Sequence, residues 1–155
     1  MDSAIAHAFT LHQQTRRNIH ALMESMEPEQ LNRIPGGLNN NLVWNAGHVI
    51  ATHELLIYAL GGHHTPSGKE FINRYRKGSR PAQPVTAEEI AYIKTELTEG
   101  GRRLQEAFGS LDWAGFTSYT TSFGISITSV GEAITFNNMH EAMHLGTMLT
   151  LRRLV

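Results

Sequence analysis

Cysteine is absent from this sequence of 155 residues. Its absence excludes disulfides, thiolate nucleophiles and cysteine-ligated metal sites, so histidine and carboxylate side chains are the remaining candidates for metal ligands. An excess of charge of one sign is also missing, because 13 basic and 14 acidic residues leave a formal net charge of −1. Proteins that bind nucleic acid usually carry a basic patch, so we expect no nucleic-acid partner.

Long hydrophobic runs are missing too. The longest run, residues 55–60, is far shorter than the roughly 20 apolar residues that a membrane-spanning helix needs. The N-terminal segment has an acidic residue at position 2 and no basic stretch before an apolar run, unlike a secretory signal. We therefore expect a cytoplasmic protein without a membrane partner.

The spacing of apolar residues predicts a single all-α domain over residues 1–155. Four helices are expected, at about residues 2–26, 41–60, 86–108 and 129–155, and the last two begin in capping boxes at 86–89 and 129–132. Residues 61–85 are rich in Gly, Pro and Ser and read as a long irregular connection, and residues 126–128 as a short extended piece. Gly100 and Gly101 predict a kink or close packing in the third helix. The pattern is typical of a four-helix bundle with a long crossover loop.

One motif dominates the last helix: His140-Glu141-Ala142-Met143-His144, or H-E-x-x-H. This motif usually indicates a zinc peptidase in which the glutamate is the general base. The extended peptidase motif requires Gly and His where this chain has Thr147 and Thr150, and no acidic residue follows Glu141 as a third ligand. The motif therefore favours a metal site and disfavours a peptidase.

The third ligand is expected on another helix. His140 and His144 lie on the apolar face of the last helix, and His48 lies on the apolar face of the second, so three imidazoles can meet at one ion. Glu141 is about 80° from this face and is expected to be a solvated charge, while His53, about 140° from His48, is expected to face solvent. The other histidines are interpreted as surface or loop residues: His7, His12, His20, His63 and His64.

Two segments carry a resemblance to a known family. Trp44-Asn45-Ala46-Gly47-His48 and, much later, the segment 140–146 (HEAMHLG) together resemble the DinB-like superfamily, as do the 78–81 loop (GSRP) and the terminal 151–153 (LRR). The resemblance implies an up-down-down-up four-helix bundle, often a homodimer, with a divalent metal ion (zinc or nickel) bound by His48, His140 and His144. Relatives include bacillithiol-using thiol S-transferases and mycothiol-dependent isomerases.

Three functions follow for such a site. The metal can activate a thiol, such as a low-molecular-weight thiol cofactor, for attack on a small electrophile, or it can hold hydroxide for hydrolysis of a small amide or ester. The alternative is a non-catalytic metal-binding module for stress response or interaction. An enzyme needs a cavity open at the metal, which we expect to be bordered by Trp44, Asn137 and the 61–85 loop. Asn137 and Glu141 are the nearest candidates for orienting a ligand or transferring a proton.

Overall fold

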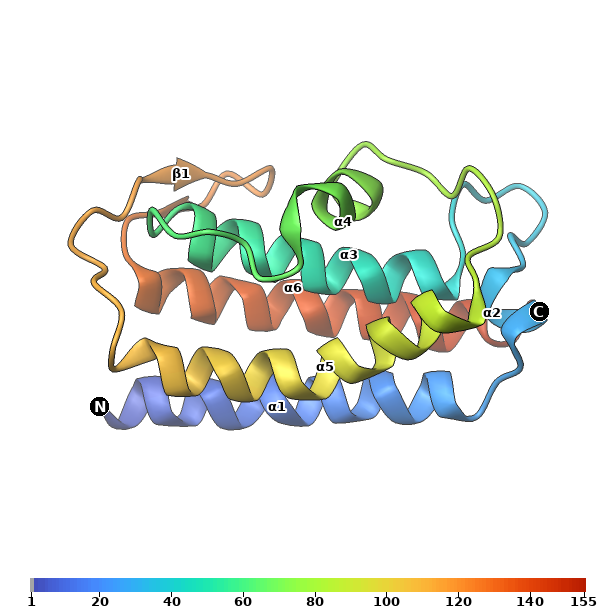
Figure 1. Cartoon of the computed structure of the whole chain (residues 1–155), viewed down its shortest axis with the longest axis horizontal. Coiled ribbons are helices and arrows are strands. Elements are labelled where there is room, and N and C mark those ends of the chain that lie inside the picture. Colours follow the sequence, from blue (N-terminus) through green and yellow to red (C-terminus); the bar gives the residue numbers. More distant parts are fainter. Residues whose placement is uncertain (1) are drawn as a thin grey trace.

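Four long helices lie side by side in the computed structural model, which describes residues 2–155 (Figure 1). They are α1 (Ser3–Glu24), α3 (Leu42–Glu54), α5 (Ala87–Phe108) and α6 (Val130–Leu151), and the short helix α2 (Pro28–Asn32) follows α1. Figure 1 shows α1 and α6 running in one direction and α3 and α5 in the other, with the two termini at opposite ends. The all-α prediction is confirmed.

The long helices begin where the sequence offers N-caps. The side chains of Asn41, Thr86 and Ser129 accept hydrogen bonds from backbone N–H groups in the first turns of α3, α5 and α6. A capping box also requires the glutamate side chain to accept from the backbone N–H of the capping residue, and this part of both predictions is wrong. Glu132 accepts from the N–H of Thr128, one residue earlier than a capping box requires. Glu89 instead accepts from the side chains of Arg74 and Tyr75, so it ties the start of α5 to a neighbouring helix.

The core lies where α1 and α3 each pack against both α5 and α6. Gly100 and Gly101 lie against side chains of α1. A Cβ atom would lie 3.2 Å from Arg16 Nη1 at position 100 and 3.3 Å from the His12 ring at position 101. The predicted close packing is confirmed, and the two glycines admit two polar side chains of α1 into the bundle.

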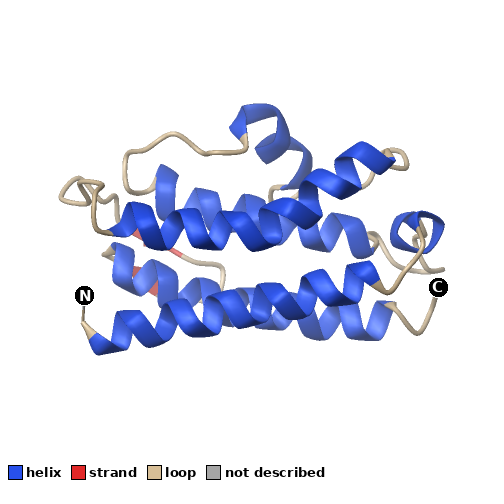
Figure 2. Ribbon diagram, turned by 60° about the horizontal axis from the view of Figure 1, so that its bottom comes forward, coloured by secondary structure: helices blue, strands red, loops and turns tan. Residues whose placement is uncertain are grey.

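The connection predicted at residues 61–85 is only partly irregular, because it contains α4 (Gly68–Tyr75) (Figure 2). Contacts at both ends tie α4 to α3. At its start, the buried Glu54 carboxylate accepts from the N–H and the hydroxyl of Ser67. At its end, the Tyr75 ring lies on Gly47, where a Cβ atom would be 2.4 Å from the ring.

Two departures from regular helix lie at one end of the bundle. The predicted helix 41–60 continues past α3 as one π-helical turn, η1 (Leu55–Ala59). Between α5 and α6, β1 (Tyr119–Thr120) pairs antiparallel with β2 (Ser126–Ile127), which includes most of the predicted extended piece. Within residues 2–155, no helix is both long enough and apolar enough to cross a lipid bilayer.

Candidate metal centre

Three imidazole rings converge between α3 and α6. His48, His140 and His144 each offer a ring nitrogen, and these nitrogens all lie within 4.8 Å of one another. The ring centroids of each pair are 4.5–5.2 Å apart. No fourth His, Cys, Asp or Glu belongs to this group in the part of the chain that the structure describes. The structure therefore brings together the three residues that the sequence predicts as metal ligands.

His48 is oriented by neighbours on both sides of its ring. Its Nδ1 donates to the backbone carbonyl oxygen of Tyr75 at 2.7 Å, and its ring stacks on the indole of Trp44 at 4.8 Å between centroids and 10° between planes. The Trp44 Nε1 donates in turn to the hydroxyl of Ser79. Because only glycine at position 47 lets α4 approach this closely, Gly47 determines where the Tyr75 carbonyl lies. The other ring nitrogen, Nε2, has only the Thr52 hydroxyl as a partner, at 3.3 Å, and is the nitrogen that a metal ion would use.

His144 is held by a side chain from the same motif as His48. Its Nδ1 donates to Asn45 Oδ1 at 2.8 Å. The Asn45 amide is itself fixed, because its Nδ2 donates to the Asn41 carbonyl oxygen at 2.7 Å and to Asn40 Oδ1 at 3.1 Å. Hydrogen bonds of this kind orient histidine ligands in metal sites and make them more basic. Our sequence reasoning overlooked Asn45, although its place in the W-N-x-G-H motif was a signal.

The protonation states of the three rings suit a cation. Burial lowers the pKa of all three, and together with the neighbouring rings it lowers the pKa to about 4 for His140 and to about 3 for His144. All three are therefore neutral at pH 7, as a metal ligand must be. The His140 Nδ1 is buried and has no hydrogen-bond partner. Two oriented rings and a third with an unsatisfied buried nitrogen fit a divalent ion.

An open pocket of about 440 Å³ reaches two of these rings, His48 and His140. Its wall is formed by the end of α3, by η1, by the β1 strand and its flanking segments, and by Phe136 of α6. The prediction that Trp44, Asn137 and the 61–85 connection border the cavity is wrong in part. Trp44 and Asn137 do not line this pocket, and Lys77 is the one residue of the 61–85 connection that does. The π-helical turn gives the pocket three of its wall residues: Leu55, Leu56 and Ala59.

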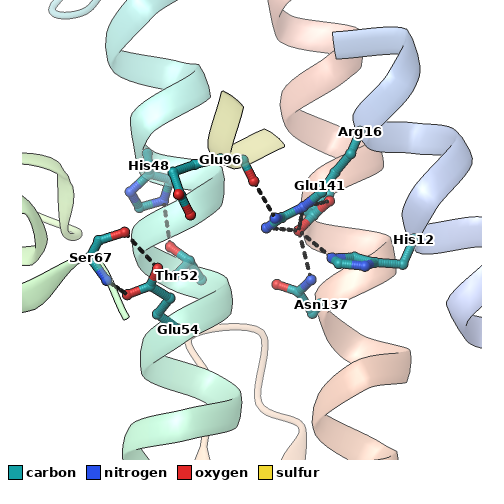
Figure 3. Close-up of polar contacts among 9 residues, drawn as sticks. All are labelled: His12, Arg16, His48, Thr52, Glu54, Ser67, Glu96, Asn137 and Glu141. Atoms are coloured by element: carbon teal, nitrogen blue, oxygen red, sulfur yellow. Dashed lines mark hydrogen bonds and ion pairs between the residues drawn. The ribbon is translucent and has the colours of Figure 1, made fainter. Parts of the chain in front are cut away.

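Glu141 is not a solvated charge, and that prediction is wrong. Its side chain is fully buried and meets Arg16 and His12 of α1 (Figure 3). The Arg16 guanidinium donates to both carboxylate oxygens at 2.9–3.2 Å, and Asn137 Nδ2 donates to Oε1 at 2.8 Å. His12 Nε2 lies 3.2 Å from the same oxygen. Burial alone would raise the pKa of Glu141, but the charges of Arg16 and His12 lower it more, so Glu141 stays ionised.

Two further histidines are buried, contrary to the prediction. His12 and His53 are 1% and 2% exposed, and their ring centroids are 5.1 Å apart. Rotation around the helix axis away from His48 does not bring His53 to solvent, because 12 of the 13 residues of α3 are buried. Burial lowers the pKa of His53 well below its usual value. His7 and His64 are exposed and His20 and His63 half-buried, so these four are the surface or loop residues expected.

Comparison with known proteins gives one family match. The family model described as DinB superfamily matches residues 11–148, which include both histidine-bearing segments. No curated protein and no solved structure matches the chain.

Proposed function

Because this chain belongs to the DinB superfamily, we propose that it binds one divalent metal ion, zinc or nickel, through His48, His140 and His144. The observation that carries the proposal is the set of three neutral imidazoles whose nitrogens lie within 4.8 Å of one another. Imidazole nitrogen suits both metals. When bound, such an ion supplies the positive charge that lowers the pKa of a coordinated water or thiol.

We further propose that the site acts on a small molecule, as a thiol S-transferase or as a hydrolase. The pocket at His48 and His140, about 440 Å³, falls within the range of small-molecule sites, roughly 300–1,000 Å³. A thiol substrate has to come from outside, since the chain contains no cysteine. The Thr52 hydroxyl lies 3.3 Å from His48 Nε2 and is placed to hydrogen-bond a group that binds there.

Peptidase chemistry is disfavoured by the surroundings of Glu141. In an H-E-x-x-H peptidase the glutamate acts as the base on a metal-bound water. Here the Glu141 carboxylate accepts from Arg16 and Asn137 and has no access to solvent. The geometry therefore assigns it to the packing of α6 against α1.

A non-catalytic metal-binding module is the second candidate, and one observation favours it. No Asp or Glu lines the pocket anywhere in the described chain, so the wall offers no carboxylate as a general base. Turnover of thiol or ester substrates by the metal-loaded protein separates the two candidates.

Metal analysis of the purified protein beside His48→Ala tests the proposal. We expect about one zinc or nickel ion per chain in the wild type and in His64→Ala, a control in which an exposed histidine is removed. We expect the ion to be lost from His48→Ala while the helical circular dichroism stays unchanged. Metal that persists in His48→Ala but is lost from His140→Ala would show that the three-histidine site is wrong.

We also propose that the protein is a homodimer and acts in the cytoplasm. Light scattering of the protein eluting from a sizing column measures the first point, and a monomer of 17.3 kDa at micromolar concentration would contradict it. Fractionation of cells that express the chain measures the second.

A further inference from the structure

The wall of the pocket carries a single Lys or Arg and, within residues 2–155, no carboxylate. That cation is Lys77, from the segment that follows α4. It forms no ion pair and no side-chain hydrogen bond with any described residue, whereas Arg74 of α4 pairs with Glu70 and Glu89. Lys77 therefore remains available to a ligand.

Lys77 follows Tyr75 by two residues, and Tyr75 is in contact with the metal site. The carbonyl oxygen of Tyr75 accepts the hydrogen bond that orients His48, and the Tyr75 ring lies on Gly47. Residues two apart have Cα atoms at most about 7 Å from each other. The contact that orients a candidate metal ligand therefore also places Lys77 at the same pocket.

The rest of the wall is apolar, with hydroxyl groups on one side. Leu55 and Leu56 of the π-helical turn, and Leu60 directly after it, line the pocket with the rings of Phe123 and Phe136, which are 5.9 Å apart. Hydroxyls come from the segment around β1: Thr117, Tyr119, Thr121 and Ser122. Such a wall favours burial of a hydrocarbon or aromatic body, and an unpaired charge there would be costly without a partner.

We propose that the pocket selects a small molecule with an apolar body and one anionic group, which pairs with Lys77 while the opposite end of the molecule meets His48 and His140. This inference rests on the proposed function, since it takes the histidine end of the pocket as the reacting end. A cationic ligand would be repelled by Lys77, and a second anionic group would find no second basic side chain on the wall. Lys77 is thus a specificity residue and takes no part in bond making.

A pair of thiols that differ only in the remote group tests the inference. The probes are 6-mercaptohexanoate and 6-mercaptohexan-1-ol, added to the Co²⁺-loaded protein, and thiolate coordination is followed by its charge-transfer absorption. We expect both thiols to give the band and the carboxylate to bind about fivefold more tightly, a difference of about 1 kcal/mol. The preference should shrink as salt is added, because Lys77 is exposed.

The variant Lys77→Met removes the charge and keeps most of the length of the side chain. We expect it to bind the two thiols equally, with cobalt content and the affinity for 6-mercaptohexan-1-ol unchanged. Lys69→Met, which removes an exposed charge outside the pocket wall, should keep the wild-type preference. Equal binding of the two thiols by the wild type, or a preference that survives in Lys77→Met, would overturn the inference and leave the metal site intact. Failure to bind cobalt, or absence of the band with both thiols, would instead count against the proposed function.

Discussion

Replacing Glu141 by alanine should destabilise the protein without emptying the metal site. The substitution removes the carboxylate that accepts from Arg16 and Asn137, and it leaves the Arg16 guanidinium 1% exposed. The remaining partner of that guanidinium is the backbone carbonyl of Glu96, at 3.4 Å. Breaking a buried ion pair from one side in this way costs about 3–5 kcal/mol.

This loss of unfolding free energy can be measured because it is a large part of the total unfolding free energy of the protein. A domain of this size has an unfolding free energy of about 5–15 kcal/mol, so the variant should fold over most of that range. Urea unfolding followed by circular dichroism at pH 7 should give the loss in free energy, and the midpoint of thermal unfolding should fall by about 6–20 °C. Glu106→Ala, which breaks an exposed pair with Arg102 on α5, is the control and should change little.

A double variant separates the ion pair from other effects of the substitution. In Arg16→Met with Glu141→Leu, neither charge is left buried alone, so the double variant should be more stable than Glu141→Ala. Metal content should stay at the wild-type value in Glu141→Ala, because the carboxylate forms its hydrogen bonds with His12, Arg16 and Asn137 and with none of the three imidazoles. The reasoning is refuted if Glu141→Ala is as stable as the wild type, or if the folded variant loses its metal.

Three further perturbations address the packing and the protonation of the site. Gly47→Ala places a Cβ atom 2.4 Å from the Tyr75 ring, so it should lower the free energy of unfolding by about 1–3 kcal/mol and weaken metal binding. Gly36→Ala, which has open space around the new Cβ atom, should change neither quantity. Equal metal affinities of Gly47→Ala and the wild type would contradict this prediction. Asn45→Ala removes the acceptor for His144 Nδ1 and should weaken metal binding about 10- to 100-fold by titration against a chelator, and a change under twofold would count against an orienting role. The metal-free protein should lose stability as the pH falls from 6.5 toward 3, because the pKa of His144 is lowered to about 3 in the folded state. In this pH range the His144 ring is protonated in the unfolded chain and neutral in the folded chain, so a lower pH favours unfolding. The lowered pKa values of His140 and His53 add to the same dependence, so His144→Gln should reduce the difference in stability between pH 7 and pH 5 in urea titrations, and an unchanged difference would show that His144 does not contribute to it.

The fold was predictable where the sequence of a helix alone carries the signal for that helix. Apolar spacing identifies α1, α3, α5 and α6, and the side chains of Asn41, Thr86 and Ser129 mark three of their starts. The short helix α4 was missed because eight residues carry little helical preference of their own. Its stability comes from contacts with α3 that are distant in sequence, such as the Tyr75 ring on Gly47.

The three candidate ligands could be predicted from the sequence, but the residues that surround them could not. Angles around a helix axis place His140 and His144 on one face, but they do not say which helix covers the neighbouring face. Here α1 covers it, and Arg16 and His12 meet Glu141 there, so a charge expected in water lies in the core. The same limitation explains His53.

X-ray absorption at the edge of the bound metal tests the central claim most directly, because it reports the ligand atoms themselves. For the zinc-loaded protein we expect nitrogen or oxygen at about 2.0–2.1 Å, no sulfur, and the outer-shell scattering of three imidazole rings. His48→Gln should show one imidazole fewer if it still holds any zinc. A spectrum that requires two imidazoles or fewer in the wild type, or one that is unchanged in His48→Gln, would contradict a metal centre built by His48, His140 and His144.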